Sequence, residues 1–372
     1  MTEALAAVID AIVTPQAEEV DGGGVFPRAA KYALGKAGLL GLTSAAEAGG
    51  AGQGLAAAAG VVRHLAAACG STAMVVLMHY AATAVIEAHG PDEVRRDIAR
   101  GEHLTTLAFS EVGSRSHFWA PLGTAAGSEG GIRLDARKSF VTAAGEADGY
   151  VWSSLPLAAP GPMTLWLVPG DAPGLSVGGP FDAIGLRGNA SSPMTAGGVR
   201  PRSMLGADGA GLDIALATAL PTFLVLNAAF SLGVIDALVT AASAHVAGTR
   251  LEHLGQRLAD QPSARAAFAR AAIRRDQVQA FLHDVLTALE TGRDDATLRV
   301  LQVKAVAAEA AIEVADEVMR LCGGSALRRD LGIERRFRDA LAARVMAPTT
   351  EALHDFVGRL SFGLPLLDGG PS

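Results

Sequence analysis

The spacing of apolar residues changes twice along the 372-residue chain and divides it into three segments. In residues 1–103, apolar side chains recur every three or four positions, as in residues 5–13 (LAAVIDAIV), which predicts helices. Residues 104–205 instead hold short β-branched or aromatic runs bounded by Gly, Pro and Ser, which predicts strands. Helical spacing returns in residues 206–372. We therefore predict an α+β fold with an N-terminal helical domain, a middle, mainly antiparallel β-domain or barrel, and a C-terminal four-helix bundle.

Individual elements can be placed within this outline. Pro27 stands where the first turn of a helix tolerates proline, so a helix is expected to begin there. Strands are expected at residues 104–109, 131–135, 149–153, 163–168 and 174–177. Long helices are expected at residues 55–69, 71–89, 264–290 and 296–321. A last helix is expected over residues 333–356, with Pro348 disturbing it.

The composition narrows the class of protein. Hydrophobic residues make up 50% of the chain and charged residues 19%, which is typical of a well-buried globular protein. The net charge is −7 and no cluster of Lys and Arg is present, so a nucleic-acid partner is not expected. The two cysteines, Cys69 and Cys322, lack the spacing of a zinc or dithiol site. We expect no metal, and reduced thiols in a cytoplasmic protein.

Two segments bear on a membrane or export role. Residues 1–10 contain acids and lack a basic region, so they do not resemble a signal peptide. Residues 214–235 hold no charged side chain and are long enough to span a bilayer. However, this segment contains Pro221, Asn227 and many alanines, which is more typical of a helix buried inside a bundle. No membrane association is therefore expected.

Residues 331–350 (LGIERRFRDALAARVMAPTT) carry the most informative motif of the chain. Their Glu-Arg…Arg-Asp-Ala pattern resembles the C-terminal signature of the acyl-CoA dehydrogenase flavoproteins. In that family the helix continues to Glu-Gly-Thr, and the Glu takes a proton from the carbon next to a thioester. This Glu position falls on Ala347, while Thr349 matches the Thr. The second location of the base that the family uses falls on Phe223.

Two motifs of the middle segment resemble the flavin-binding segments of the same family, in the same order. Residues 108–116 (AFSEVGSRS) resemble Thr-Glu-Pro-x-x-Gly-Ser-Asp, and residues 140–143 (FVTA) resemble Trp-Ile-Thr-Asn. Residues 69–74 (CGSTAM) are similar to a segment of the family's N-terminal helices. The resemblance implies that the cofactor is FAD and that it lies against Phe109, Ser110, Ser116, Phe140 and Thr142.

The resemblance also implies an oligomer. In the family, a neighbouring subunit completes the FAD site with an Arg ahead of a Phe-Gly and with a Gln-x-x-Gly-Gly. Arg250 stands near the first of these positions, and Arg320 with Gly323 and Gly324 stands at the second. The implied FAD contacts of the last segment are therefore Arg250, Arg320, Gly323, Gly324 and Thr349. A homodimer or homotetramer that binds an acyl-CoA-like small molecule is expected.

Removal of an α-proton requires a base, and neither Ala347 nor Phe223 can accept a proton. Glu351 lies four residues after Ala347, on the same face of a continuous helix. His117 lies in the flavin loop, and imidazole is a common base near neutral pH. Both are candidate bases, with Glu111 a weaker one.

Three functions stay open. The leading hypothesis is oxidation of an acyl thioester or related small substrate with an unusual base. The others are a flavin-dependent monooxygenase, which needs no such base, and a non-catalytic partner subunit of a mixed oligomer.

Overall fold

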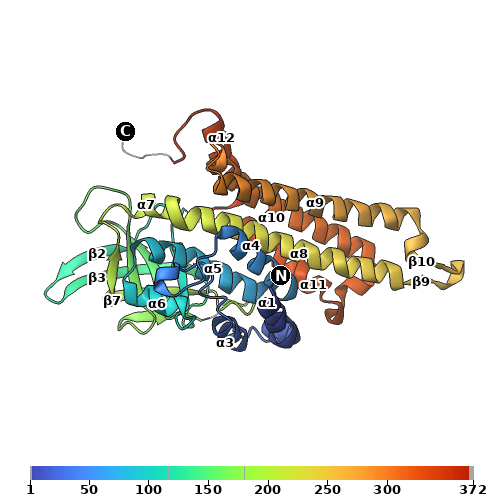
Figure 1. The fold of residues 1–372 in the computed structure, drawn as a ribbon, viewed down its shortest axis with the longest axis horizontal. Helices are drawn as coiled ribbons and strands as arrows, with labels where there is room; N and C mark the ends of the chain where they lie inside the picture. The colour runs from blue at the N-terminus through green and yellow to red at the C-terminus, as the bar shows by residue number, and fades with distance from the viewer. Residues whose placement is uncertain (1, 116, 180, 368–372) are drawn as a thin grey trace.

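The computed structural model describes residues 2–115, 117–179 and 181–367. Its elements follow the order that the apolar spacing predicts, with helices first, then sheets, then long helices (Figure 1). The strands gather at one end of the molecule, and the long helices extend from them to a small hairpin at the other end (Figure 1). The α+β prediction and its three-part order are confirmed.

The N-terminal part consists of helices, of which α5 is the most buried. They are α1 (Glu3–Val8), which continues through a π-helical turn (Ile9–Val13) into α2 (Thr14–Gly22), then α3 (Arg28–Lys36), α4 (Leu55–Ala68), α5 (Gly70–His89) and α6 (Asp92–Ala99). As predicted, Pro27 precedes the first turn of α3. His79 of the buried helix α5 accepts a hydrogen bond from Thr105 N (3.1 Å), and its other nitrogen lies 3.0 Å from Leu40 O. Burial lowers the pKa of His79 to about 4, so the ring is neutral and joins α5 to the first strand.

The middle part forms two four-stranded sheets rather than a closed barrel. One holds β1 (Thr105–Ala108), β4 (Gly149–Ser154), β5 (Thr164–Pro169) and β8 (Ser203–Leu205), with β1 and β4 parallel and the other pairs antiparallel. The other is antiparallel and holds β2 (Thr124–Ser128), β3 (Gly131–Val141), β7 (Ser192–Val199) and β6 (Leu175–Val177). Trp152 and Trp166 are cross-strand neighbours in the first sheet and are fully buried. They contribute to a core shared by both sheets.

The C-terminal part is built around one long apolar helix. It contains α7 (Gly211–Ile214), a π-helical turn (Ala215–Ala219), α8 (Leu220–Gly248), α9 (Pro262–Glu290), α10 (Ala296–Cys322), α11 (Ile333–Val345) and α12 (Thr350–Ser361). The short strands β9 (Arg250–Leu251) and β10 (Gln256–Arg257) form the hairpin at the far end. Helix α8 packs against α4, α5, α9, α10 and α11. Its apolar surface is thereby covered on all sides, as the sequence prediction for residues 214–235 requires.

Two long helices, Gly70–His89 and the run Gly211–Gly248, are apolar enough to cross a membrane by length and composition alone. In each, 83% of the most apolar window is buried inside the protein. A core helix of a folded bundle meets the same criterion, so these helices are weak evidence of a membrane role.

The prediction of one helix over residues 333–356 is wrong. Helix α11 ends at Val345 and α12 begins at Thr350, and the Ala347–Pro348 peptide between them is cis. Proline lacks an N–H and its ring clashes with the preceding turn, so the helix cannot pass through Pro348. Ala347 and Glu351 therefore do not share the face of one continuous helix.

Candidate active site

A cavity of about 1140 Å³ lies where the sheets meet the start of α8 and helix α11 with the turn that follows it. This volume lies slightly above the range of ordinary ligand pockets, which is about 300–1,000 Å³. Its wall is assembled from segments far apart in the chain. The lining residues fall within 24–28, 107–113, 139–146, 177–178, 181–192, 215–223 and 338–348, together with Met78, Arg115 and Phe118.

The sheet side of the cavity brings together four of the predicted FAD contacts, Phe109, Ser110, Phe140 and Thr142. Within the described part of the chain, the hydroxyl groups of Ser110 and Thr142 have no hydrogen-bond partner. The Phe140 ring is 67% exposed and stacks on Phe181 at 4.7 Å between centroids. Two free hydroxyls and an exposed aromatic face at the wall of a large cavity fit a flavin ring system. Ser116, the fifth predicted contact on this side, lies outside the described residues.

Glu111 and Lys138 form a buried ion pair behind this wall. Lys138 Nζ donates to Glu111 Oε1 at 2.5 Å and also to Ser153 O (2.7 Å) and Ser153 Oγ (2.9 Å). Glu111 Oε2 accepts from the backbone N–H groups of Leu122 (2.9 Å) and Gly123 (2.7 Å). Burial lowers the pKa of Lys138 to about 8, against the opposing charge of Glu111. The pair thus joins the loop that follows β1 to β3 and β4, and both oxygens of Glu111 accept hydrogen bonds.

The bundle side of the cavity is apolar. It is formed by the residues Leu220, Phe223, Leu341, Ala342, Val345, Met346, Ala347 and Pro348. Both positions at which the family resemblance places a base, Phe223 and Ala347, lie on this wall. Neither side chain can exchange a proton, so the surface that faces the sheet side carries no acid or base at these positions.

Only two carboxylates occur among the described residues that line the cavity, Glu111 and Glu146. Glu111 is held by Lys138 as described above. Glu146 accepts from Arg28 Nε at 3.0 Å, and a second bond from the same guanidinium completes the pair. Each carboxylate is therefore neutralised by a cation, and the described lining offers no free carboxylate as a proton acceptor.

The two candidate bases from the sequence lie away from this cavity. Glu351 is exposed in the first turn of α12, beyond the break at Pro348. The His117 ring is also exposed, with Nδ1 2.7 Å from Ser114 O and its edge against Trp119. His117 lines a separate cleft of about 260 Å³ beside α12. A role for either as the base stays a prediction, and it would require the side chain to reach the large cavity from these places.

The predicted FAD contacts of the last segment do not line the cavity of the same chain. Arg250 lies in the hairpin at the far end of the bundle, 3.9 Å from Glu252 (Figure 1). The exposed Arg320 pairs with Asp316 and Glu317, both at 3.1 Å, and is followed by Gly323 with φ +56° and by Gly324. The Thr349 hydroxyl accepts from Ala352 N (3.3 Å) as the N-cap of α12. Their proposed contact with FAD of a neighbouring subunit stays a prediction.

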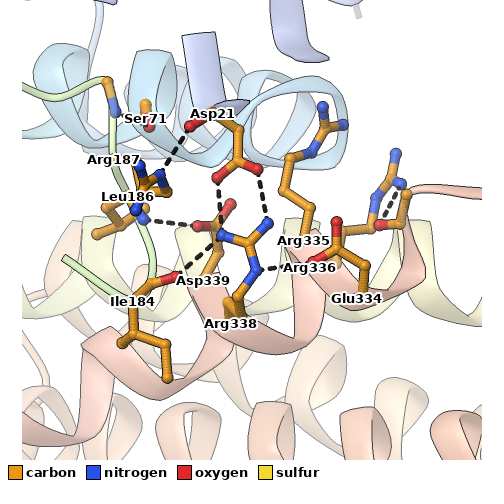
Figure 2. Close-up of polar contacts among 12 residues, drawn as sticks. Asp21, Ser71, Ile184, Leu186, Arg187, Glu334, Arg335, Arg336, Arg338 and Asp339 are labelled. Atoms are coloured by element: carbon orange, nitrogen blue, oxygen red, sulfur yellow. Dashed lines mark hydrogen bonds and ion pairs between the residues drawn. The ribbon is translucent and has the colours of Figure 1, made fainter. Parts of the chain in front are cut away.

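The Arg-Asp pair of the C-terminal signature fixes the walls of the cavity (Figure 2). Arg338 donates two bonds to Asp21 of α2 (2.9 and 2.6 Å), and its Nε donates to Glu334 (2.7 Å). The buried Asp339 accepts from Leu186 N at 2.7 Å. Burial raises the pKa of Asp339 to about 6. Helix α11 is thereby joined to the N-terminal helices and to residues 184–187, which line the cavity.

Backbone strain concentrates around the same cavity. The non-glycine residues with positive φ in the described chain are Arg115 (+42°), Ala143 (+57°), Leu186 (+52°) and Ala190 (+52°). Arg115, Leu186 and Ala190 line the cavity, and Ala143 follows Thr142. Such conformations cost about 1–3 kcal/mol each and cluster at functional sites, which supports this cavity as the active site.

Comparison with known proteins agrees with this geometry. The model of the acyl-CoA dehydrogenase C-terminal domain matches residues 209–361, and that of the N-terminal domain matches residues 1–101. The chain is 28% identical to the human mitochondrial short-chain specific acyl-CoA dehydrogenase, over 91% of this chain and 83% of that protein. It is 25% identical to cyclohex-1-ene-1-carbonyl-CoA dehydrogenase of Geobacter metallireducens, over 93% of each. The structure of butyryl-CoA dehydrogenase from Megasphaera elsdenii superposes with a TM-score of 0.89 at 19% identity, covering 97% of this chain and 99% of that one, which shows the shared fold.

Proposed function

Because the chain belongs to the acyl-CoA dehydrogenase family of FAD-dependent oxidoreductases, we propose that it oxidises an acyl-CoA-like thioester or a related small substrate in a cavity that lacks the family's usual base. The observation that carries the proposal is the cavity itself. Phe109, Ser110, Phe140 and Thr142 line the same cavity as the apolar residues that include Ala347, which supports a flavin site beside a substrate site. FAD, when bound between these walls, supplies an acceptor for the hydride.

The residues of this chain have distinct tasks in such a reaction. The exposed Phe140 ring offers a surface on which a flavin can stack, and the Ser110 and Thr142 hydroxyls offer hydrogen bonds to its polar edge. Phe223 and Met346 exclude water from the opposite side. A water-poor cavity strengthens the electrostatic interactions within it and protects reduced flavin from solvent.

The paired state of Glu111 and Glu146 favours a second candidate function on the same scaffold. A flavin-dependent monooxygenase uses reduced flavin and oxygen and needs no base for an α-proton. The third possibility, a non-catalytic subunit of a mixed oligomer, requires another chain to supply the base. These alternatives differ in what the bound flavin does when substrate is added.

Two spectroscopic measurements separate these functions. The purified protein, loaded with FAD, is mixed with a panel of acyl-CoAs in the absence of oxygen, and flavin absorbance is recorded. Bleaching by an acyl-CoA supports thioester oxidation, whereas substrate-dependent oxygen uptake with reduced flavin supports the monooxygenase. Protein that stays colourless with excess FAD contradicts both. Activity that then appears only with a co-encoded relative supports the partner-subunit function.

We also propose a homodimer or homotetramer. The rim of the cavity exposes large apolar side chains, including Val345 (67% exposed), Ile184 (65%) and Phe140. Apolar patches of this kind mark interaction sites, and a second copy that covers this rim would also shield a bound flavin. Light scattering of the FAD-loaded protein tests this, since a mass of one 37.9 kDa chain with FAD retained would contradict it.

A further inference from the structure

Lys304 is a buried lysine in the bundle, and no carboxylate of the described residues contacts its ammonium group. It lies on α10 with no exposed surface, and no ion pair involves it in the described part of the chain. Its ammonium group donates to three backbone carbonyls, those of Ala343 (2.9 Å), Met346 (2.9 Å) and Pro348 (2.8 Å). An ammonium group has three N–H donors, so every donor of Lys304 is used.

The three acceptors belong to the end of α11 and to the turn that follows it. The last carbonyls of any helix have no partner within the helix, and they need water, a cap or a side chain. Here the break at Pro348 also removes the option of continuing the helix. Lys304 therefore supplies, from a neighbouring helix, the donors that this helix end and turn lack.

The same turn forms part of the cavity. Met346, Ala347 and Pro348 all line it, as does Phe223, whose ring centroid lies 6.0 Å from Lys304 Nζ. Lys304 itself does not line the cavity. Its effect on a bound molecule is therefore exerted through the shape of the turn rather than by contact.

We propose that Lys304 is a positioning residue for the substrate site, which holds the turn of residues 346–348 in the shape that forms the apolar wall opposite the flavin side of the cavity. The inference rests on the proposed function only in taking this cavity as the substrate site. The hydrogen bonds that carry it do not depend on which reaction takes place.

The protonation state of Lys304 gives this role a signature. Burial lowers the pKa of Lys304 to about 7, and the charge of Glu351 on α12 opposes that shift. The groups that α8 and α11 bring next to it, the Phe223 ring and the backbone carbonyls, are uncharged. A neutral amine has two N–H donors for three carbonyls, so the turn loses one hydrogen bond as the pH rises through this range.

Amide hydrogen exchange of the FAD-loaded protein tests the proposal, with rates normalised to the intrinsic chemical rate at each pH. In Lys304→Met, exchange in peptides covering residues 346–353 is expected to rise about tenfold or more, while peptides of α4 stay unchanged. In the unmodified protein the same peptides should loosen from about pH 6 to about pH 8.5. In Lys304→Arg, which stays charged and keeps several donors, they should not respond to pH.

Binding of butyryl-CoA, measured by calorimetry, connects the turn to the substrate site. Its affinity is expected to fall about tenfold in Lys304→Met and to be largely restored in Lys304→Arg. The proposal is overturned if the turn peptides exchange equally in all three proteins, or if the turn loosens in Lys304→Met while butyryl-CoA affinity is unchanged. If Lys304→Met does not fold, the pH response of the unmodified protein against Lys304→Arg decides the question. Failure of butyryl-CoA to bind any of the three, with the exchange pattern intact, counts against the thioester substrate and leaves the role of Lys304 in the turn supported.

Discussion

Asp339 should make the stability of the protein depend on pH. Its side chain is 4% exposed, it accepts one hydrogen bond from Leu186 N, and burial raises its pKa from 3.8 to about 6. The folded state then holds this proton more tightly than the unfolded state does. The stability contributed by the protonated group is fully present below the pKa of Asp339 in the unfolded chain, 3.8, and is lost as the pH rises through its pKa in the folded chain, about 6. A difference of about two pKa units corresponds to about 3 kcal/mol.

The variant Asp339→Asn isolates this contribution. The asparagine oxygen can still accept from Leu186 N, but the side chain no longer titrates. Urea unfolding, followed by circular dichroism at fixed protein concentration, gives the free energy of unfolding from about pH 4 to about pH 7.5. Over that range, the wild-type protein should lose about 2–2.5 kcal/mol relative to Asp339→Asn, because the lowest pH already lies just above the unfolded-state pKa. The absolute stability of the variant is a separate matter, because its amide N–H group needs a new acceptor.

The exposed Asp10 provides a matched control. Asp10→Asn should follow the wild-type pH profile, because no hydrogen bond or ion pair holds the exposed Asp10 side chain in the described part of the chain. Parallel profiles of the wild type and Asp339→Asn would refute the reasoning. They would mean that Asp339 is solvated or paired in a way that its burial beside Leu186 does not suggest.

Three further substitutions test the walls of the cavity. Glu111→Gln should destabilise the protein by about 3–5 kcal/mol in thermal melts, because it leaves Lys138 charged and buried. The double variant with Lys138→Met should recover part of that loss. Equal melting temperatures of the wild type and Glu111→Gln would contradict this. Arg338→Lys should cost about 1–3 kcal/mol, since lysine cannot make the two parallel bonds to Asp21; a neutral result would show that the pair is not needed to hold α11. Thr142→Val should weaken FAD binding about tenfold in a fluorescence titration and leave the apo melting temperature unchanged; unchanged affinity would remove Thr142 from the flavin site.

The sequence predicts the fold well wherever apolar spacing is regular. The long helices α8, α9 and α10 and five of the strands follow directly from that spacing. The strands β2, β7 and β8 are missed, because β2 (TAAGS) and β7 (SPMTAGGV) are rich in small residues and β8 is only three residues long. The predicted length of the last helix is wrong, because Pro348 lacks an N–H and its ring clashes with the preceding turn, so the helix stops before it and a new one begins at Thr350.

The sequence also finds one side of the candidate site but not its supports. The family motifs contain Phe109, Ser110, Phe140 and Thr142, and the structure brings these residues together at one cavity. No local pattern in the sequence marks Asp21 or Lys304. Arg338 is 317 residues from Asp21, and the carbonyls bound by Lys304 lie 39 to 44 residues away. Such pairs become visible only when the fold sets their elements side by side.

The most direct test of the account is flavin reduction in Ala347→Glu. Ala347 lines the proposed substrate site, at the position where the family resemblance puts the base, and its side chain carries no carboxylate. In anaerobic stopped-flow experiments with butyryl-CoA, Ala347→Glu should therefore bleach bound flavin about 10²-fold or more faster than the wild type, whereas Ala347→Gln should not. Wild-type protein that bleaches as fast as Ala347→Glu would show that a proton acceptor already operates in this cavity, and the central claim would be contradicted.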